Sequence, residues 1–222
     1  MLASTVYASG KRPLLILHGL FGSKRNWKRV ANDLSAFSDV HVLDLRNHGE
    51  SFHGPMTFET MTNDLKEYCK SMEQFDLLGH SLGGRIAMAA ASSLPSLRNL
   101  ILLDISHNSK YDPNHSKYVK ALRENNFNGV DPFVAKFLKT NYTSGGLRIG
   151  LNEIDEFLQR KEIPTVGFKG KTLFLKGSES DYVKEIDKDL FPNSKLVEIK
   201  GGHWLQVDNP EEVVRQIKEF LA

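Results

Sequence analysis

A serine between two glycines, in the segment Gly79-His80-Ser81-Leu82-Gly83, follows a short apolar run in this chain. A serine on a sharp strand-to-helix turn has a cramped backbone, and glycines on either side remove the β-carbons that would clash there. Such a turn exposes the Ser81 hydroxyl. It also points the Leu82 backbone N–H, at the positive end of the following helix, toward the oxyanion that forms when Ser81 attacks a carbonyl. The segment predicts a serine nucleophile.

The flanking residues give this motif its specificity. A bare Gly-x-Ser-x-Gly pattern occurs by chance in roughly one chain in ten of this size, so an incidental serine in a glycine-rich turn is the alternative. Here the apolar run 75–78 precedes the motif, and the helix-forming, small-residue run 86–91 follows it. Strand, turn and helix in this order favour the nucleophile.

A serine hydroxyl needs a base to take its proton, and imidazole titrates near neutral pH. Of the eight histidines, His203 directly follows the last predicted strand and is preceded by two glycines, 201 and 202, that allow its loop to fold closely over the sheet edge. That loop lies at the same carboxyl edge as Ser81. We therefore expect His203 to be the base.

The loop after the first predicted strand is a second candidate element. Its sequence is His-Gly-Leu-Phe-Gly-Ser at 18–23. The Leu20 N–H is placed to join that of Leu82 in an oxyanion hole. We assign His18, Phe21 and Trp204 to the substrate pocket, with His18 also ordering its loop by hydrogen bonding.

The carboxylate that would orient the base has two candidates. Asp104 ends the predicted strand 100–104, and Asp181 follows the next predicted strand along the chain. Either loop reaches the carboxyl edge of the sheet, and an aspartate also commonly ends a strand or caps a helix. Spacing alone leaves both candidates open.

Apolar strand-like runs alternate with amphipathic helical patterns along the chain, which predicts an α/β fold with a mostly parallel sheet and helices on both faces. The predicted strands are 14–17, 40–45, 75–78, 100–104, 172–175 and 195–199, and the predicted helices of this core are 27–37, 58–72, 82–94, 183–190 and 210–221.

The segment 107–170 interrupts this alternation. It contains helical patterns at 117–125, 132–138 and 147–158 and no strong strand. An insertion between two strands would lie over their carboxyl ends, where α/β sheets bind ligands. We interpret 107–170 as a small helical cap within a single domain that spans 1–222.

The composition is that of an ordinary globular protein. The chain has 222 residues, 40% hydrophobic and 25% charged, with a net charge of +2. Scattered basic residues predict no nucleic-acid partner, and no apolar run approaches the roughly 18 residues of a membrane span. A single cysteine excludes an internal disulfide and favours a reducing compartment, so we expect an intracellular protein, cytoplasmic or, after removal of a targeting segment, mitochondrial. No ligand cluster has metal spacing.

Together, the Ser81 turn, the loop 18–23 and His203 resemble the α/β-hydrolase family in their order and over essentially the whole chain. The loop 18–23 and the Arg-Asn-His-Gly turn at 46–49 are similar to those of small bacterial and mitochondrial esterases. The family's usual acid position corresponds to Ser180 here, one residue before Asp181. The closer group has a similar serine and uses an aspartate at the end of the earlier strand, so the resemblance favours Asp104.

The resemblance implies a cofactor-independent hydrolase of small acyl esters or thioesters that acts through an acyl-serine. We expect a monomer or small homo-oligomer. Yeast mitochondrial relatives instead make acetate esters from acetyl-CoA and an alcohol, so an acyl-CoA:alcohol acyltransferase is the alternative within the same chemistry. A ligand-binding protein that has the fold without the chemistry is the non-enzymatic alternative.

Overall fold

Seven strands form one central sheet in the computed structural model, which describes all residues, 1–222. The order across the sheet is β1-β3-β2-β4-β5-β8-β9, and every neighbouring pair is parallel except β1 with β3. The strands are β1 (Ser4–Tyr7), β2 (Pro13–Leu17), β3 (Asp39–Leu43), β4 (Phe75–His80), β5 (Leu97–Leu103), β8 (Lys171–Gly177) and β9 (Ser194–Ile199).

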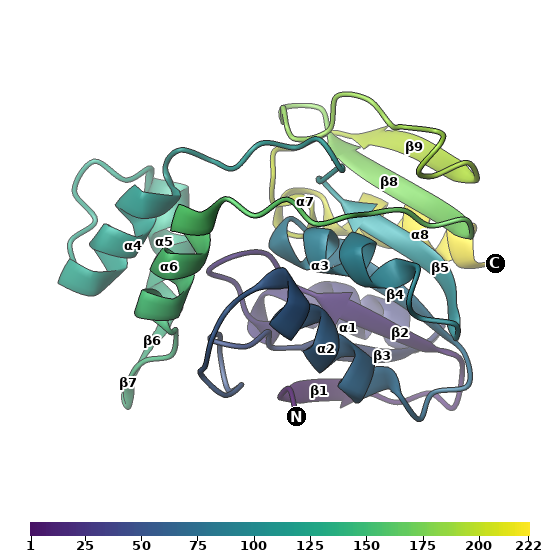
Figure 1. Ribbon diagram of the computed structural model, residues 1–222, viewed down its shortest axis with the longest axis horizontal. Coiled ribbons are helices and arrows are strands. Elements are labelled where there is room, and N and C mark those ends of the chain that lie inside the picture. Colours follow the sequence, from purple (N-terminus) through teal and green to yellow (C-terminus); the bar gives the residue numbers. More distant parts are fainter.

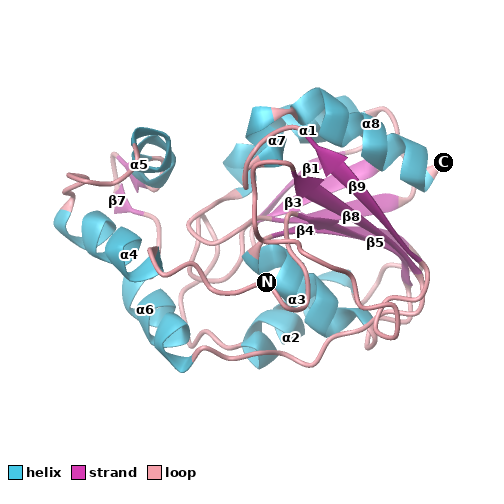
Figure 2. Cartoon of the chain, turned by 90° about the horizontal axis from the view of Figure 1, so that it is seen from above, coloured by secondary structure: helices cyan, strands magenta, loops and turns pink.

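Helices cover both faces of this sheet. Figure 2 shows α1, α7 and α8 on one side of the strands and α2 and α3 on the other. The bounds are α1 (Lys28–Ser35), α7 (Leu205–Asp208), α8 (Pro210–Leu221), α2 (Phe58–Cys69) and α3 (Leu82–Ala91), with a short 3-10 helix at Lys24–Trp27 before α1. The α/β class with a mostly parallel sheet, predicted from the alternating pattern, is confirmed.

The central strands are apolar throughout because both of their faces are covered. Successive side chains of a strand point to opposite faces. Leu14 and Ile16 of β2 accordingly pack in the core beneath α1 and α8, whereas Leu15 and Leu17 pack in the core beneath α2 and α3. All six residues of β4 are buried. The strand that carries the candidate nucleophile is thereby fixed from both sides.

Three further helices lie beside the sheet, between β5 and β8 in the chain, and Figure 1 shows them set apart from the strands. They are α4 (His115–Glu124), α5 (Pro132–Lys139) and α6 (Leu151–Arg160), with a two-stranded hairpin of β6 (Tyr142–Thr143) and β7 (Gly146–Leu147). We refer to α4–α6 and this hairpin as the cap.

The structure differs from the sequence prediction in three elements of the core, one of which is the short, unpredicted helix α7. The edge strand β1 was not predicted, because it is short and partly exposed and lacks a strongly apolar run. The predicted helix 183–190 is absent. There the Asp187 carboxylate accepts hydrogen bonds from the N–H groups of Asp189 (2.8 Å) and Leu190 (3.3 Å), a local turn that competes with helical hydrogen bonding.

Candidate active site

Ser81 lies at the junction of β4 and α3 in a strained backbone conformation. Its φ of 52° and ψ of −114° place it in a region that side chains other than glycine rarely adopt. A β-carbon on Gly79 would lie 2.4 Å from the carbonyl oxygen of Gly83, and one on Gly83 would lie 2.4 Å from that of Leu17. Only glycines allow the strand, the turn and α3 to approach this closely.

Two backbone N–H groups beside Ser81 are free to bind an oxyanion. Leu82 is the first residue of α3, so its N–H has no acceptor within the helix. The N–H of Leu20 donates no hydrogen bond within the chain. Both residues line a cavity with Ser81. These are the two residues that the sequence predicts for the oxyanion hole.

The carboxylate that pairs with His203 is Asp104, since its Oδ2 lies 2.7 Å from Nδ1 of His203. Asp104 is wholly buried at the end of β5 and also accepts hydrogen bonds from the backbone N–H of Gly177 (2.9 Å) and from the hydroxyl of Ser180. Burial acts to raise the pKa of Asp104, but the hydrogen bonds and the charge of His203 outweigh it, so the pKa is lowered. The carboxylate therefore stays ionised.

Asp181, the alternative acid, lies elsewhere. Its side chain is exposed and lines a separate cavity that contains neither Ser81 nor His203. The neighbouring Ser180, at the family's usual acid position, instead donates its hydroxyl hydrogen bond to Asp104. The structure thus brings together Ser81, His203 and Asp104 at one edge of the sheet and leaves Asp181 outside this group.

Aromatic and imidazole rings hold His203 in place. The ring of Tyr182 stacks on the imidazole at a centroid distance of 4.0 Å. Nε2 of His80 lies 2.8 Å from the His203 carbonyl oxygen. Burial first, and then the charge of His203, lower the pKa of His80 to about 3, so His80 is neutral and donates this bond. Sequence reasoning missed Tyr182, because an aromatic residue in a loop carries no signal of what it stacks on.

Ser81 and His203 line the same cavity without a hydrogen bond between their side chains. The Ser81 hydroxyl has no partner within the chain, and the His203 side chain is 15% exposed. Bonds between a nucleophile and its base are often long in unliganded enzymes and shorten when substrate binds. The arrangement suits proton transfer from the serine to the imidazole during attack on a carbonyl.

His18 does not line this cavity, which corrects the prediction that places it in the substrate pocket. It is buried, with Nδ1 2.8 Å from the carbonyl oxygen of Gly19 and Nε2 accepting from the N–H of Leu45 at 3.0 Å. Both nitrogens are thus used in ordering the loop 18–23, which we call the oxyanion loop. Burial lowers the pKa of His18, which keeps the ring neutral for these two roles.

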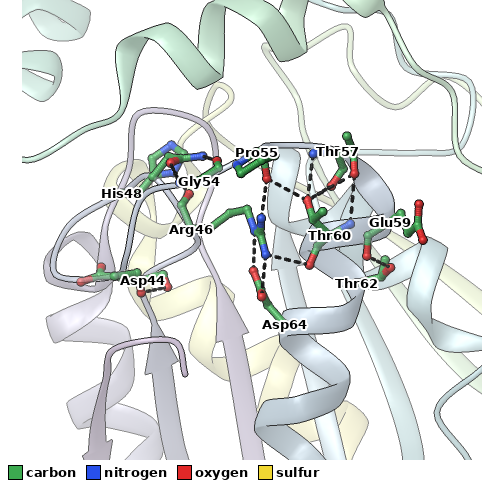
Figure 3. A network of polar contacts seen from close by, with 12 residues as sticks. Asp44, Arg46, His48, Gly54, Pro55, Thr57, Glu59, Thr60, Thr62 and Asp64 are labelled. Carbon is green, nitrogen blue, oxygen red and sulfur yellow. Dashed lines mark hydrogen bonds and ion pairs between the residues drawn. The ribbon is translucent and has the colours of Figure 1, made fainter.

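The turn 46–49 packs against the oxyanion loop and forms a hydrogen bond with it. Nε2 of His48 accepts a hydrogen bond from the N–H of Phe21 at 3.3 Å. Arg46 holds the turn to α2 through a two-point contact with Asp64, whose carboxylate oxygens lie 2.6 and 2.7 Å from the guanidinium nitrogens (Figure 3). The conformation of the oxyanion loop therefore depends on a buried polar network as well as on its own glycines.

The cavity on the His203 side of Ser81 has walls of mixed character and a volume of about 30 Å3. Its polar lining includes Asp112 and His115, and its apolar lining includes Phe21, Trp204 and, from α5, Val134, Phe137 and Leu138. The Trp204 ring also contacts the ring of Phe137, with centroids 5.6 Å apart. One wall of the cavity thus comes from the cap and the other from the sheet loops.

Comparison with known proteins shows the family of this chain. Residues 12–145 match the model of the alpha/beta hydrolase fold family. The chain therefore belongs to the α/β-hydrolase family. None of its helices has the length and apolar character that a membrane span requires.

Named relatives cover nearly the whole chain. It is 34% identical to the sn-1-specific diacylglycerol lipase ABHD11 of Danio rerio, over 94% of this chain and 78% of that one. It is 25% identical to ethanol acetyltransferase 1 of Wickerhamomyces anomalus, over 94% of this chain and 68% of that one. The structure of a marine microorganism esterase superposes with a TM-score of 0.89 at 33% identity, covering 99% of this chain and 98% of that one.

Proposed function

We propose that this protein is a serine esterase that hydrolyses small acyl esters or thioesters. Ser81 is the nucleophile, His203 is the general base and then acid, and Asp104 orients His203 and stabilises its protonated form. The observation that carries the proposal is the 2.7 Å contact between His203 and Asp104, at a cavity that Ser81 also lines. Relatives named as a lipase and an esterase support the reaction class.

The proposed reaction has two halves. Ser81 Oγ forms a bond to the acyl carbonyl carbon while its proton passes to His203, and the N–H groups of Leu20 and Leu82 bind the oxyanion. The bond to the leaving oxygen or sulfur then breaks, and this atom takes the proton from His203. Water attacks the acyl-serine in the same way, gives its proton to His203, and releases the acid as Ser81 regains a proton.

The test is hydrolysis of p-nitrophenyl acetate by the wild type and by Ser81→Ala. Ser92→Ala, at the exposed far end of the same helix, is the matched control. We expect turnover by the wild type and the control and none above background by Ser81→Ala. Equal turnover by all three proteins would rule out Ser81 as nucleophile. No turnover by folded wild type on any ester would favour a binding protein without the chemistry.

Acyl transfer to an alcohol is the second candidate, and the aromatic walls beside His203 favour it. Phe21, Phe137 and Trp204 border the space beside His203 where the attacking water or alcohol must lie. Such walls disfavour water relative to a small alcohol, and relatives named as ethanol acetyltransferases share this chemistry. Incubation with acetyl-CoA and ethanol distinguishes the two reactions, because transfer yields ethyl acetate and hydrolysis yields acetate alone.

A further inference from the structure

A buried cation without a counter-charge lies one helical turn beyond Ser81. Arg85 of α3 is only 6% exposed and forms no ion pair with any carboxylate. Its one hydrogen bond goes to the backbone carbonyl of Ser109, and its guanidinium lies 4.6 Å from the centre of the Tyr111 ring. A guanidinium has five N–H donors, so most of them are unused.

This situation is costly for a folded protein. A charge removed from water needs an opposite charge or a full set of hydrogen bonds. Burial accordingly lowers the pKa of Arg85. No nitrogen of Arg85 is among the side-chain atoms that are both fully enclosed and unpaired, so its free N–H groups face the cavities that Arg85 lines. An anionic ligand group would supply the missing partner.

Arg85 faces the reacting centre. It lines the small cavity, of about 20 Å3, that also contains Ser81 and both oxyanion residues, Leu20 and Leu82. It lines as well a wider cleft of about 640 Å3 that opens beside this cavity. A substrate group that passes from Ser81 toward this cleft must therefore pass Arg85.

The two sides of Ser81 differ in a way that assigns the parts of the substrate. The leaving group must be within reach of His203, which protonates it. His203 lines the cavity of Phe137 and Trp204 and does not line the cavity of Arg85. The leaving group therefore belongs on the side of Phe137 and Trp204, and the acyl group belongs on the side of Arg85.

Other charged groups around the wider cleft give it a positive balance. Lys110 and Lys161 line it with Arg85, against the single carboxylate of Asp112. His115 borders the same cleft, and its buried Nδ1 has no hydrogen-bond partner. The cations around this opening are suited to binding an anion, and the tautomer of His115 with a proton on Nδ1 can donate a further hydrogen bond to it.

We propose that Arg85 binds a carboxylate at the far end of the substrate's acyl group, so that this protein prefers half-esters or half-thioesters of short dicarboxylic acids. The inference rests on the proposed esterase function and names its substrate class. Arg85 acts here as a specificity-determining residue, which contacts the substrate away from the reacting atoms.

The experiment compares isosteric pairs in which a carboxylate replaces a terminal methyl group. Monomethyl succinate, glutarate and adipate are paired with methyl butyrate, pentanoate and hexanoate, and acid release is followed at constant pH. We expect the wild type to prefer the charged member of at least one pair. Arg85→Met should lower the charged-to-neutral ratio of kcat/KM about 10- to 100-fold, the usual range for a hydrogen bond to a charged group.

Two further variants separate recognition from structure. Arg85→Lys keeps the charge without the two-point geometry, so its ratio should fall between those of the wild type and Arg85→Met. Arg123→Gln removes an arginine on α4 that is 49% exposed and lies outside both cavities, and its ratio should equal that of the wild type.

Three results would overturn the proposal. If the wild type shows no higher kcat/KM for any charged ester than for its neutral partner, Arg85 does not bind a substrate carboxylate. Equal losses on both members of each pair would show that Arg85 only holds Ser109 and Tyr111. A loss confined to acetate esters of an anionic alcohol, such as O-acetylglycolate, would place the anion on the leaving group. Turnover of p-nitrophenyl acetate that depends on Ser81 shows separately whether the esterase function holds.

Discussion

The sheet edge and the cap are built by different means, although both border the same cavity. At the sheet edge, Ser81 and Asp104 both have positive φ values, and Asp104 accepts three hydrogen bonds with no exposed surface. In the cap, α5 contributes apolar side chains such as Phe137 that pack against Trp204 without polar contacts. The sheet edge holds the proposed reacting side chains in fixed positions, whereas the cap forms one wall of the cavity beside them. Catalytic rate and substrate choice should therefore respond to different mutations.

The largest effect is expected for the base at the sheet edge. His203→Gln removes the proposed acceptor of the Ser81 proton, and kcat should fall roughly 10^5-fold. His53→Gln changes an exposed histidine outside the site and should keep the wild-type rate. Steady-state hydrolysis of p-nitrophenyl acetate measures both. A His203→Gln variant with more than a tenth of the wild-type kcat would contradict the role of His203.

Asp104→Asn is expected to have the next largest effect. The amide cannot stabilise the protonated imidazole and favours the wrong tautomer, so kcat should fall about 10^3- to 10^4-fold. Asp181→Asn is the matched control and should stay within about twofold of the wild type, since its side chain is exposed and away from His203. The reverse order of the two effects would assign the acid to Asp181.

A cap mutation should change selectivity more than rate. Phe137→Ala enlarges the leaving-group side of the cavity, and the kcat/KM ratio of benzyl acetate to methyl acetate should rise about tenfold, the usual scale for a small change in an apolar pocket. Phe133 also contacts Trp204 but is 43% exposed and does not line the cavity, so Phe133→Ala should leave this ratio unchanged. If the benzyl-to-methyl ratio is similar for both variants, the leaving group does not lie against Phe137.

The smallest effect is expected for the free energy of unfolding when His48, which supports the oxyanion loop, is replaced. Burial first, and then the charge of His18, lower the pKa of His48 to about 3. In the unfolded chain His48 takes up a proton as the pH falls below about 6.5, whereas in the folded chain it stays neutral. The free energy of unfolding therefore decreases as the pH falls through this range. The free energy of unfolding of His48→Gln should therefore depend on pH less steeply between pH 6 and 5, by about 1 kcal/mol per unit.

Urea unfolding at several pH values gives this slope. Lys195→Gln, at an exposed residue of β9 that does not titrate in this range, should keep the slope of the wild type. Equal slopes for the wild type and His48→Gln would mean that His48 is not held in its neutral form by burial.

The features that could be predicted from the sequence are those set by local chain geometry. A strand followed by a glycine-flanked serine and a helix specifies its own turn, so the position of Ser81 and its neighbour Leu82 could be inferred from a dozen residues. The alternation of strands and helices likewise predicted the sheet that the structure shows. His203 was found because it follows a strand of that sheet.

The remaining features depend on contacts between distant segments. Asp104 and Asp181 both end up near the carboxyl edge, and only the packing of β8 against β5 decides which faces His203. The position of His18 in a loop that borders the pocket predicts a pocket residue, whereas its ring instead accepts a hydrogen bond from the N–H of Leu45. Arg85 gave no signal, because the lack of a partner for a charge is visible only in three dimensions.

The most direct test of the central claim is mass spectrometry after reaction of the folded protein with a fluorophosphonate, which modifies serines activated by a neighbouring base. We expect one adduct per chain, on the peptide that contains Ser81, with none on Ser81→Ala and a far slower reaction for His203→Gln. An unmodified Ser81 in folded wild-type protein, or an adduct that forms equally fast without His203, would contradict the account.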